Sequence, residues 1–275
     1  MTSPLRSFAL AAAFAVSTSA AYAADQCAAA KTLEEGIFTI ATGNPAYFPW
    51  VIDDAPESGK GFEAAVAYAV ADKMGFDAEH VKWVRTSFDG SIQPGAKNFD
   101  VNMQQFSITE DRDKIVDFSE PYYTSAMAVL TIQPIVDAGA KPTLESLKAL
   151  KWGADASTTA VPMLVGLVGP DSDPMLYNDN ADVSAALMAG QIDAALFDLP
   201  TALFLAAVTV ENGVVLGQFP ADRSTNPDRF GMLMEEGSPL KPCVDDAIKA
   251  LKDDGTLAKL EATWLAEGTG VPVIK

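Results

Sequence analysis

Histidine, cysteine and long apolar runs are scarce in this sequence of 275 residues, which contains one histidine and two cysteines. The single histidine, His80, removes most hydrolase triads and most zinc sites from consideration. No GxSxG elbow, Walker A loop or GxGxxG fingerprint is present, so serine hydrolysis and nucleotide cofactors have no support. The sequence therefore predicts a protein that is not an enzyme and that uses no cofactor or metal ion.

Positive charge is also scarce, because 19 Lys and Arg residues stand against 37 Asp and Glu residues. Such an acidic balance argues against nucleic acid and anionic membranes as partners. No segment after the N-terminal region offers the roughly 20 apolar residues that a membrane-spanning helix needs. We therefore expect a soluble protein, although its acidity does not identify a ligand.

The N-terminus has the parts of a secretory signal peptide. Arg6 precedes a small apolar run over residues 8–16, and Ala21-Tyr22-Ala23 provides small residues for cleavage. We expect residues 1–23 to be removed and the mature protein to be exported to the periplasm.

Cys27 and Cys243 form an even pair in a chain that we expect to reach an oxidising compartment. Neither cysteine lies in a CxxC or metal-like spacing. We expect a disulfide that ties the N-terminal segment to the C-terminal region. On the loop-entropy model it contributes up to about 4 to 5 kcal/mol. The alternative is two independent buried thiols.

From Gly36 onward, short β-rich runs alternate with helical periodicity, which is typical of an α/β fold with mostly parallel sheets. Apolar residues at helical spacing predict helices at 62–74, 144–150 and 183–188, after residue 200 and from residue 239. Strands are expected at 37–41, 81–84, 99–103, 126–132, 151–154, 194–197 and 214–216.

The mature chain of about 250 residues is long enough for two lobes of about 100 to 150 residues each. No Pro- or Ser-rich linker separates them, which favours strands that cross a hinge and later return. We expect a discontinuous first lobe, residues 24–125 and 222–275, and a second lobe, residues 126–221.

Arg112 lies in the most informative stretch, residues 106–112, which follows a strand and reads as a helix start capped by Ser107 or Thr109. The positive end of a helix disfavours a cation by a few tenths to about 1 kcal/mol, so Arg112 needs an anionic partner. A ligand carboxylate held bidentately could be this partner. Glu110, Asp111 or another acid of the protein could equally be the partner, and these residues alone do not distinguish the two possibilities.

Five further motifs accompany this stretch: Tyr47-Phe48-Pro49-Trp50, Gly61-Phe62-Glu63, Asp117-Phe118-Ser119-Glu120-Pro121-Tyr122-Tyr123, Gln191-Ile192-Asp193-Ala194-Ala195 and Asp254-Gly255-Thr256-Leu257. Together they resemble family 3 periplasmic solute-binding proteins, the polar amino acid receptors of ABC transporters, over almost the whole mature chain. The resemblance implies a type II periplasmic-binding-protein-like fold, with hinge strands and a ligand cleft between two lobes. It also implies a monomer that closes around an amino acid and delivers it to a membrane permease.

The resemblance assigns the ligand's charged groups to residues of both lobes. Arg112 matches the arginine that pairs with the α-carboxylate, and Ser107 matches a hydroxyl donor to the same group. Thr158 and Thr159 match the turn that completes the carboxylate cradle from the second lobe, and Asp198 matches the acid that accepts the α-ammonium. Helix capping is the local alternative for Thr158, Thr159 and Asp198.

Tyr47 and Phe88 match aromatic positions that sandwich the ligand side chain, where stacking or cation–π contact contributes about 0.5 to 2 kcal/mol. Core packing is the alternative, more so for Phe88, since prolines around Tyr47 place it in a loop. Gln104 and Gln105 fall where the family often has small residues that meet the ligand, so their bulk reduces the expected room.

Two rival functions follow from related resemblances. The fold also resembles that of cyclohexadienyl dehydratases, so a periplasmic lyase is the enzymatic alternative, with Glu63, Asp198 or Glu235 as the general acid it would need. A binding protein that signals to a sensor is the other.

Overall fold

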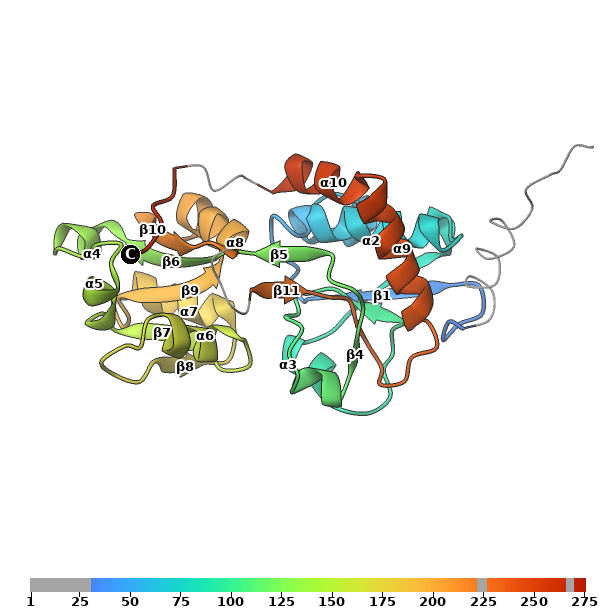
Figure 1. The fold of residues 1–275 in the computed structure, drawn as a ribbon, viewed down its shortest axis with the longest axis horizontal. Coiled ribbons are helices and arrows are strands. Elements are labelled where there is room, and N and C mark those ends of the chain that lie inside the picture. The colour runs from blue at the N-terminus through green and yellow to red at the C-terminus, as the bar shows by residue number, and fades with distance from the viewer. Residues whose placement is uncertain (1–30, 222–226, 266–269) are drawn as a thin grey trace, which may run out of the picture.

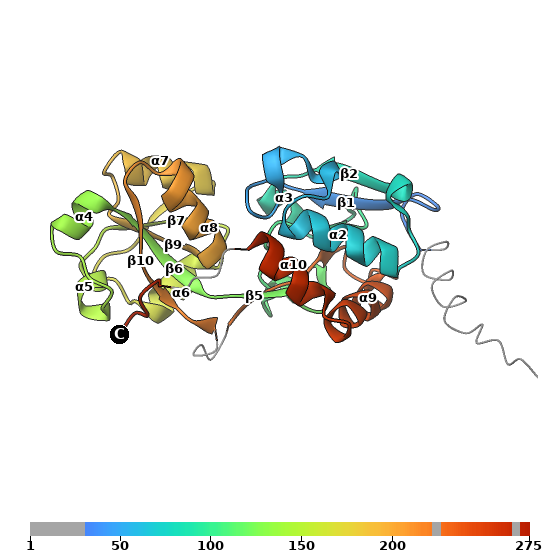
Figure 2. The same ribbon diagram turned by 90° about the horizontal axis from the view of Figure 1, so that it is seen from above.

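The computed structural model describes residues 31–221, 227–265 and 270–275. Two five-stranded sheets lie side by side, each packed against helices, and a two-stranded ribbon runs between them (Figure 1, Figure 2). Each sheet with its helices forms one lobe. The expected α/β fold with two lobes is confirmed.

The first sheet has the order β2 (Val81–Arg85), β1 (Phe38–Thr42), β3 (Val101–Asn102), β12 (Leu233–Met234) and β4 (Asp117–Phe118). Its helices are α2 (Phe62–Lys73), α3 (Phe88–Ile92), α9 (Lys241–Asp253) and α10 (Thr256–Trp264). Every residue of β1 is buried, as expected for a central strand whose two faces are both covered. The lobe also contains single 3-10 turns at Ile52–Asp54, Pro56–Ser58, Ala78–His80 and Arg112–Lys114.

The second sheet has the order β10 (Gly213–Phe219), β6 (Met127–Ile132), β9 (Ala194–Asp198), β7 (Trp152–Asp155) and β8 (Met175–Tyr177). Its helices are α4 (Gln133–Asp137), α5 (Leu144–Lys148), α6 (Ala160–Leu167), α7 (Asn180–Met188) and α8 (Leu199–Phe204), which continues into a π-helix, Leu205–Thr209.

In each sheet four of the five strands run in the same direction and one, β12 or β6, runs against them, so the expectation of mostly parallel sheets is confirmed. Strand β1 is parallel to β2 and β3, and β7 is parallel to β8 and β9. In contrast, β12 is antiparallel to β3 and β4, and β6 is antiparallel to β9 and β10. The antiparallel members are the strands by which the chain enters or re-enters each lobe, so their direction follows from the crossing between lobes.

The connecting ribbon consists of β5 (Tyr123–Ser125) and β11 (Asp228–Phe230), which pair antiparallel with Ser125 opposite Asp228. The chain leaves the first lobe through β5, which continues into β6, and β11 leads back to β12.

The expected lobe boundaries need one correction at the C-terminus. Val273 pairs with Gln218 of β10, the Leu144 amide donates to the Lys275 carbonyl at 2.9 Å, and Ile274 is buried in the second lobe's core. The end of the chain therefore packs on the second lobe, because its apolar residues complete that core. The other boundaries stay a prediction.

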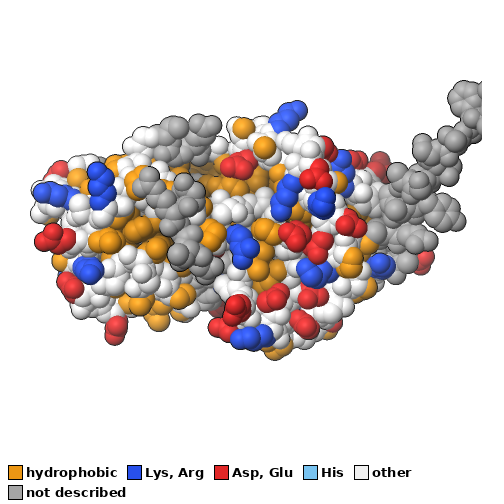
Figure 3. Space-filling model, viewed as in Figure 1, with side chains coloured by type: hydrophobic (Ala, Val, Ile, Leu, Met, Phe, Trp, Pro, Cys, Tyr) orange, Lys and Arg blue, Asp and Glu red, His pale blue; other side chains and the backbone are white. Residues whose placement is uncertain are grey.

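Charge is distributed unevenly between the lobes. In the described part of the chain, the ion pairs all join residues of the first lobe. On the face shown in Figure 3, charged side chains gather over the first lobe, on the right, whereas more apolar side chains are visible on the second.

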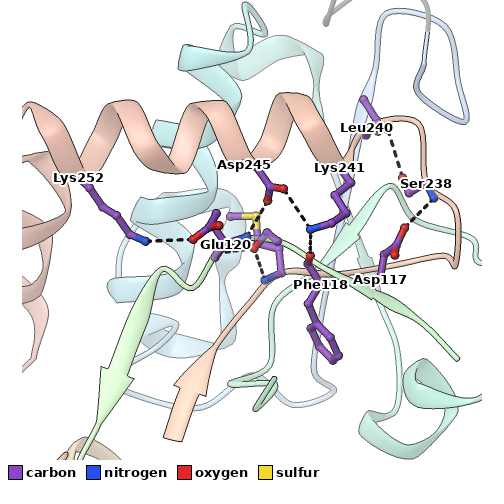
Figure 4. Close-up of polar contacts among 10 residues, drawn as sticks. Asp117, Phe118, Glu120, Ser238, Leu240, Lys241, Asp245 and Lys252 are labelled. Carbon is purple, nitrogen blue, oxygen red and sulfur yellow. Dashed lines mark hydrogen bonds and ion pairs between the residues drawn. The ribbon is translucent and has the colours of Figure 1, made fainter. Parts of the chain in front are cut away.

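The segment 117–123 is held by polar contacts within the first lobe. The Glu120 amide donates to Asp245 Oδ1 at 2.6 Å, the Ser238 amide donates to Asp117 Oδ2 at 3.0 Å, and Lys241 Nζ donates to the Phe118 carbonyl (Figure 4). Lys241 also pairs with Asp245 at 3.1 Å. These contacts fasten β4 and the start of β5 to helix α9, so this motif stabilises the lobe rather than touching a ligand.

Asp245→Ala should lower the stability of the protein without changing ligand affinity. The change removes the acceptor of the Glu120 amide and the partner of Lys241, which together contribute about 1 kcal/mol. For a chain of this size that corresponds to a melting temperature lower by about 2–4 °C. Asp246→Ala, an exposed acid next to it on α9, is the control. Equal melting temperatures for the two variants would contradict the assignment.

Two expectations concern residues outside the described part of the chain. Cys243 is buried on α9, but Cys27 lies among residues that the structure does not describe, so the disulfide stays a prediction. The signal peptide, residues 1–23, lies outside it as well. Among the described residues, no helix has the length and apolarity that crossing a membrane requires.

Candidate functional site

A cavity of ≈ 280 Å³ lies between the two lobes, at the carboxyl ends of parallel strands from both sheets. Asp155 and Asp198 are the last residues of β7 and β9, and the segments after β1 and β3 carry Tyr47 and Gln104. Ligands commonly bind at this edge in open α/β sheets. The sequence placed nine residues at a ligand, and all line the cavity: Tyr47, Phe88, Gln104, Gln105, Ser107, Arg112, Thr158, Thr159 and Asp198. Their roles in binding stay predictions.

Arg112 lies on a single 3-10 turn, Arg112–Lys114, so the expected longer helix is not formed. The turn ends at Ile115, whose φ of −131° and ψ of −16° are not helical, and strand β4 begins at Asp117. Thr109 nevertheless accepts the Arg112 amide through its hydroxyl, at 3.2 Å. With only one turn, the helix dipole contributes little at Arg112.

The Arg112 guanidinium joins the two lobes. Its Nη1 donates to the Ser107 carbonyl and its Nη2 to the Ser157 carbonyl, each at 2.9 Å, and it lies 5.4 Å from the centre of the Phe88 ring. Burial lowers its pKa, while the charges of Asp228 and Asp155 oppose that shift. In the described part of the chain, neither Glu110 nor Asp111 pairs with Arg112, so the local ion-pair alternative is not what the structure shows.

Further contacts hold the lobes together around the cavity. The Ser107 and Thr159 hydroxyls are 2.9 Å apart, and Trp50 Nε1 donates to the Thr201 hydroxyl at 2.9 Å. The Phe48 and Phe204 rings have centres 4.6 Å apart. Each pair has one member in each lobe. The structure therefore shows a closed arrangement of the lobes.

Ser107 and the threonine turn are positioned by backbone pairing. Ser107 bridges to Phe230 of β11, so the connecting ribbon fixes its place. Thr158 accepts the Ala160 amide at 3.3 Å, as helix capping predicts, whereas Thr159 makes no side-chain cap and its hydroxyl meets Ser107 instead.

Asp198 acts as the N-cap of α8, because its Oδ1 accepts the Thr201 amide at 2.8 Å. The capping alternative is confirmed, and Asp198 still lines the cavity. Burial raises the pKa of its carboxyl to about 6. Asp228 of β11 has a pKa raised to about 6 for the same reason, although the Ser107 hydroxyl and Arg112 lower it in part.

Glu63 at the start of α2 is almost fully buried in the cavity wall, and burial raises its pKa to about 7. It accepts a hydrogen bond from the Tyr122 hydroxyl, from the Gln105 amide at 2.8 Å and from Gln105 Nε2 at 2.5 Å. These bonds hold Gln105 at a φ of 54°, in the left-handed region that few non-glycine residues adopt.

Gln104, Phe88 and Tyr47 differ in how far contacts within the first lobe already hold them. Gln104 Nε2 donates to Thr86 and Asn102, both at 3.0 Å, so its amide is held by the first lobe. Phe88 stacks on Phe106 with ring centres 4.6 Å apart, which supports its core-packing alternative, although it also faces Arg112. Tyr47 is about half exposed at the cavity.

Several lining residues were not among the expected ligand contacts: Phe48, Glu63, Asp155, Thr201, Phe204 and Asp228. Phe48 and Glu63 belong to motifs that were visible in the sequence. Asp228 carried no local signal, because its place beside Ser107 depends on the pairing of β11 with the rest of the fold.

Two lobes that close over an interlobe cavity define the class of small-solute-binding proteins. The family model of bacterial extracellular solute-binding proteins, family 3, matches residues 39–267. The chain belongs to this family.

Individual relatives agree with the family. The chain is similar to the L-cystine-binding protein of Escherichia coli (strain K12), with 30% identity over 214 residues that cover 74% of this chain and 73% of that protein. It is similar to an ancestral arginine-binding protein bound to arginine, with a TM-score of 0.67, 25% identity and coverage of 84% of this chain and 99% of that chain.

A third similarity bears on the enzymatic alternative. The structure of an ancestral amino acid-binding protein, a precursor of cyclohexadienyl dehydratase, matches with a TM-score of 0.65 and 27% identity, covering 84% of this chain and 96% of that chain. That relative is itself described as a binding protein. The family and its members are binding proteins of transporters, so the expectation that this chain is not an enzyme is confirmed.

Proposed function

We propose that this chain is the extracytoplasmic substrate-binding component of an ABC transporter, which binds a polar amino acid in the interlobe cavity and delivers it to a membrane permease. The observation that carries the proposal is the cavity itself, where one buried guanidinium and several buried carboxyls face the same closed space. A zwitterion has the complementary pair of charges. The relative bound to arginine supports an amino acid as the ligand class.

In this proposal the ligand's α-carboxylate meets Arg112, Ser107, Thr158 and Thr159. An arginine side chain has five N–H donors. The Arg112 guanidinium uses two of them on the Ser107 and Ser157 carbonyls, so further donors remain for a ligand carboxylate. Asp198 accepts the α-ammonium, with Glu63 close enough for the two charges to interact.

Tyr47 and Phe88 flank the ligand side chain, and Gln104 and Gln105 form the wall beside it. Because the ligand touches both lobes, its binding free energy favours the closed state, as any ligand-driven closure requires. Export by the signal peptide places a monomeric receptor in the periplasm, where it meets the permease.

A thermal-shift screen of the mature protein tests this function. At least one polar amino acid should raise the melting temperature, because a ligand that binds only the folded state stabilises it by mass action. A panel of amino acids, sugars and dicarboxylates is the measurement. If no zwitterion changed the melting temperature while a sugar or a dicarboxylate raised it, the amino acid assignment would be refuted.

The unliganded protein should become more stable as the pH falls from 8 to 5. The pKa values of Glu63, Asp198 and Asp228 are raised by burial to about 7, 6 and 6, so the folded state holds protons that the unfolded chain releases. This stability is complete below the unfolded pKa values and is lost as the pH rises through the folded ones. Its total size is on the order of a few kcal/mol. The charged and titratable groups around these acids are Arg112, Tyr122, Tyr123 and Asp155.

Melting temperatures of the unliganded protein across this pH range are the measurement, with Glu63→Gln as the variant that removes one titration. Glu57→Gln, an exposed position near the same helix, is the control. A flat profile for the unaltered protein would show that the buried acids are not protonated in the empty cavity.

A further inference from the structure

The charges around the cavity do not balance. Five acids line it, at Glu63, Asp155, Asp179, Asp198 and Asp228, and Arg112 is the single cation among its described lining residues. Buried charges without partners are costly, so such a cavity favours an occupant that brings positive charge.

Arg112 cannot neutralise more than part of this excess. Burial lowers its pKa, and the charges of Asp228 and, to a smaller extent, Asp155 oppose that shift, so Arg112 offsets part of the charge of these two acids. A zwitterionic ligand adds one negative charge to Arg112 and one positive charge to Asp198. The net charge of the filled cavity is then the same as before, and the excess of acids remains.

Two of the lining acids, Asp155 and Asp179, lie near Tyr47, the aromatic residue proposed to flank the ligand side chain. Burial raises the pKa of Tyr47, and the charges of Asp179 and Asp155 raise it further. Asp155 is 6% exposed, and its pKa is raised by burial and by Asp89 and Asp179. Its hydrogen bonds come from the Ser157 amide at 2.9 Å and the Ser157 hydroxyl at 2.7 Å, both to Oδ1, which leaves Oδ2 for an occupant.

The remaining acids have other roles. Asp179 is an exposed N-cap whose Oδ1 accepts the Asp182 amide, so water screens it. Asp198 and Glu63 interact with each other, and Glu63 accepts the Gln105 amide. Asp155 is therefore the buried lining acid whose charge Arg112 offsets only in part, after that of Asp228, and whose Oδ2 accepts no hydrogen bond from the described residues.

We propose that the cavity selects amino acids whose side chain carries a positive charge, and that Asp155 is the residue that recognises this charge beside the Tyr47 ring. The proposal rests on the function proposed above. The aromatic ring suits such a side chain twice, since its face attracts a cation and its apolar surface packs against methylene groups. The chemical class is a guanidinium or ammonium group at the end of a short aliphatic chain.

Arginine and citrulline provide the sharpest comparison, because they differ in shape by little and in side-chain charge by one unit. Calorimetric titration of the mature protein should show arginine, lysine or ornithine binding at least about tenfold more tightly than citrulline and glutamine. Asp155→Asn keeps the acceptor for Ser157 but removes the charge, so it should reduce the preference for the cation to about threefold or less. Asp173→Asn, an exposed acid of the same lobe that does not line the cavity, should leave the preference unchanged.

The outcomes separate this inference from the function on which it rests. Equal affinity for citrulline and arginine would overturn cation selection while leaving amino acid binding intact. A preference for arginine that persists in Asp155→Asn would overturn the role of Asp155. Failure of every amino acid to bind would instead overturn the proposed function. The melting temperature of the unliganded Asp155→Asn variant confirms that the cavity is still formed.

Discussion

Arg112→Ala should weaken amino acid binding by about a hundredfold or more. Removing one partner of a buried charge pair costs about 2–5 kcal/mol, and each 1.4 kcal/mol is a factor of ten in affinity. The change also deletes the two bonds to the Ser107 and Ser157 carbonyls, one in each lobe, so the closed state loses support as well. Calorimetric titration with the best ligand of the thermal-shift screen is the measurement.

Two comparisons isolate the carboxylate contact from the loss of closure. Lys114→Ala alters a cation on the same 3-10 turn that is exposed and paired with Asp111, so it should bind normally. Agmatine is arginine without the carboxylate, so its affinity should fall much less in Arg112→Ala than that of arginine. If Arg112→Ala bound amino acids normally while Asp198→Ala did not, Arg112 would not be the carboxylate partner.

The periodic elements were the part of the fold that the sequence predicted well. Strand β1 was expected at 37–41 and is found at Phe38–Thr42, and helix α2 was expected at 62–74 and is found at Phe62–Lys73. Both are long enough for a pattern of apolar residues to be visible. Strands β3, β4 and β12 have two residues each, which is too short for periodicity to show. Their antiparallel pairing depends on the return of the chain from the second lobe.

The candidate site was predictable where a motif carried it and not where distant segments meet. Ser107, Arg112 and Asp198 stood in recognisable stretches and all reach the cavity. The longer helix expected around Arg112 is absent because strand β4 begins soon after it and ends the turn. The bonds from Gln105 to Glu63 span 42 residues of sequence, and no local pattern signals them. Asp155 became a candidate only when its burial and its neighbours could be examined together.

Asp198 offers the second large effect, because its capping and binding roles can be separated by the choice of substitution. Asp198→Asn preserves an acceptor for the Thr201 amide, and Asn caps helices as well as Asp does, so α8 should keep its stability. The variant loses the negative charge that accepts the α-ammonium, so amino acid affinity should fall by about thirtyfold to a hundredfold. Asp198→Ala loses both roles and should also melt lower, by the equivalent of about 1 kcal/mol.

Paired measurements of melting temperature and affinity on the two variants decide between the roles. Asp182→Asn, an exposed acid of the same lobe in the first turn of α7, is the control for a general loss of negative charge. If Asp198→Asn bound the ligand with unchanged affinity, Asp198 would be a helix cap alone. The α-ammonium would then have to be held by Glu63, which lies close enough to interact with Asp198 and has no cation among the groups that set its pKa. In that case Glu63→Gln, and not Asp198→Asn, would lower the affinity for the ligand.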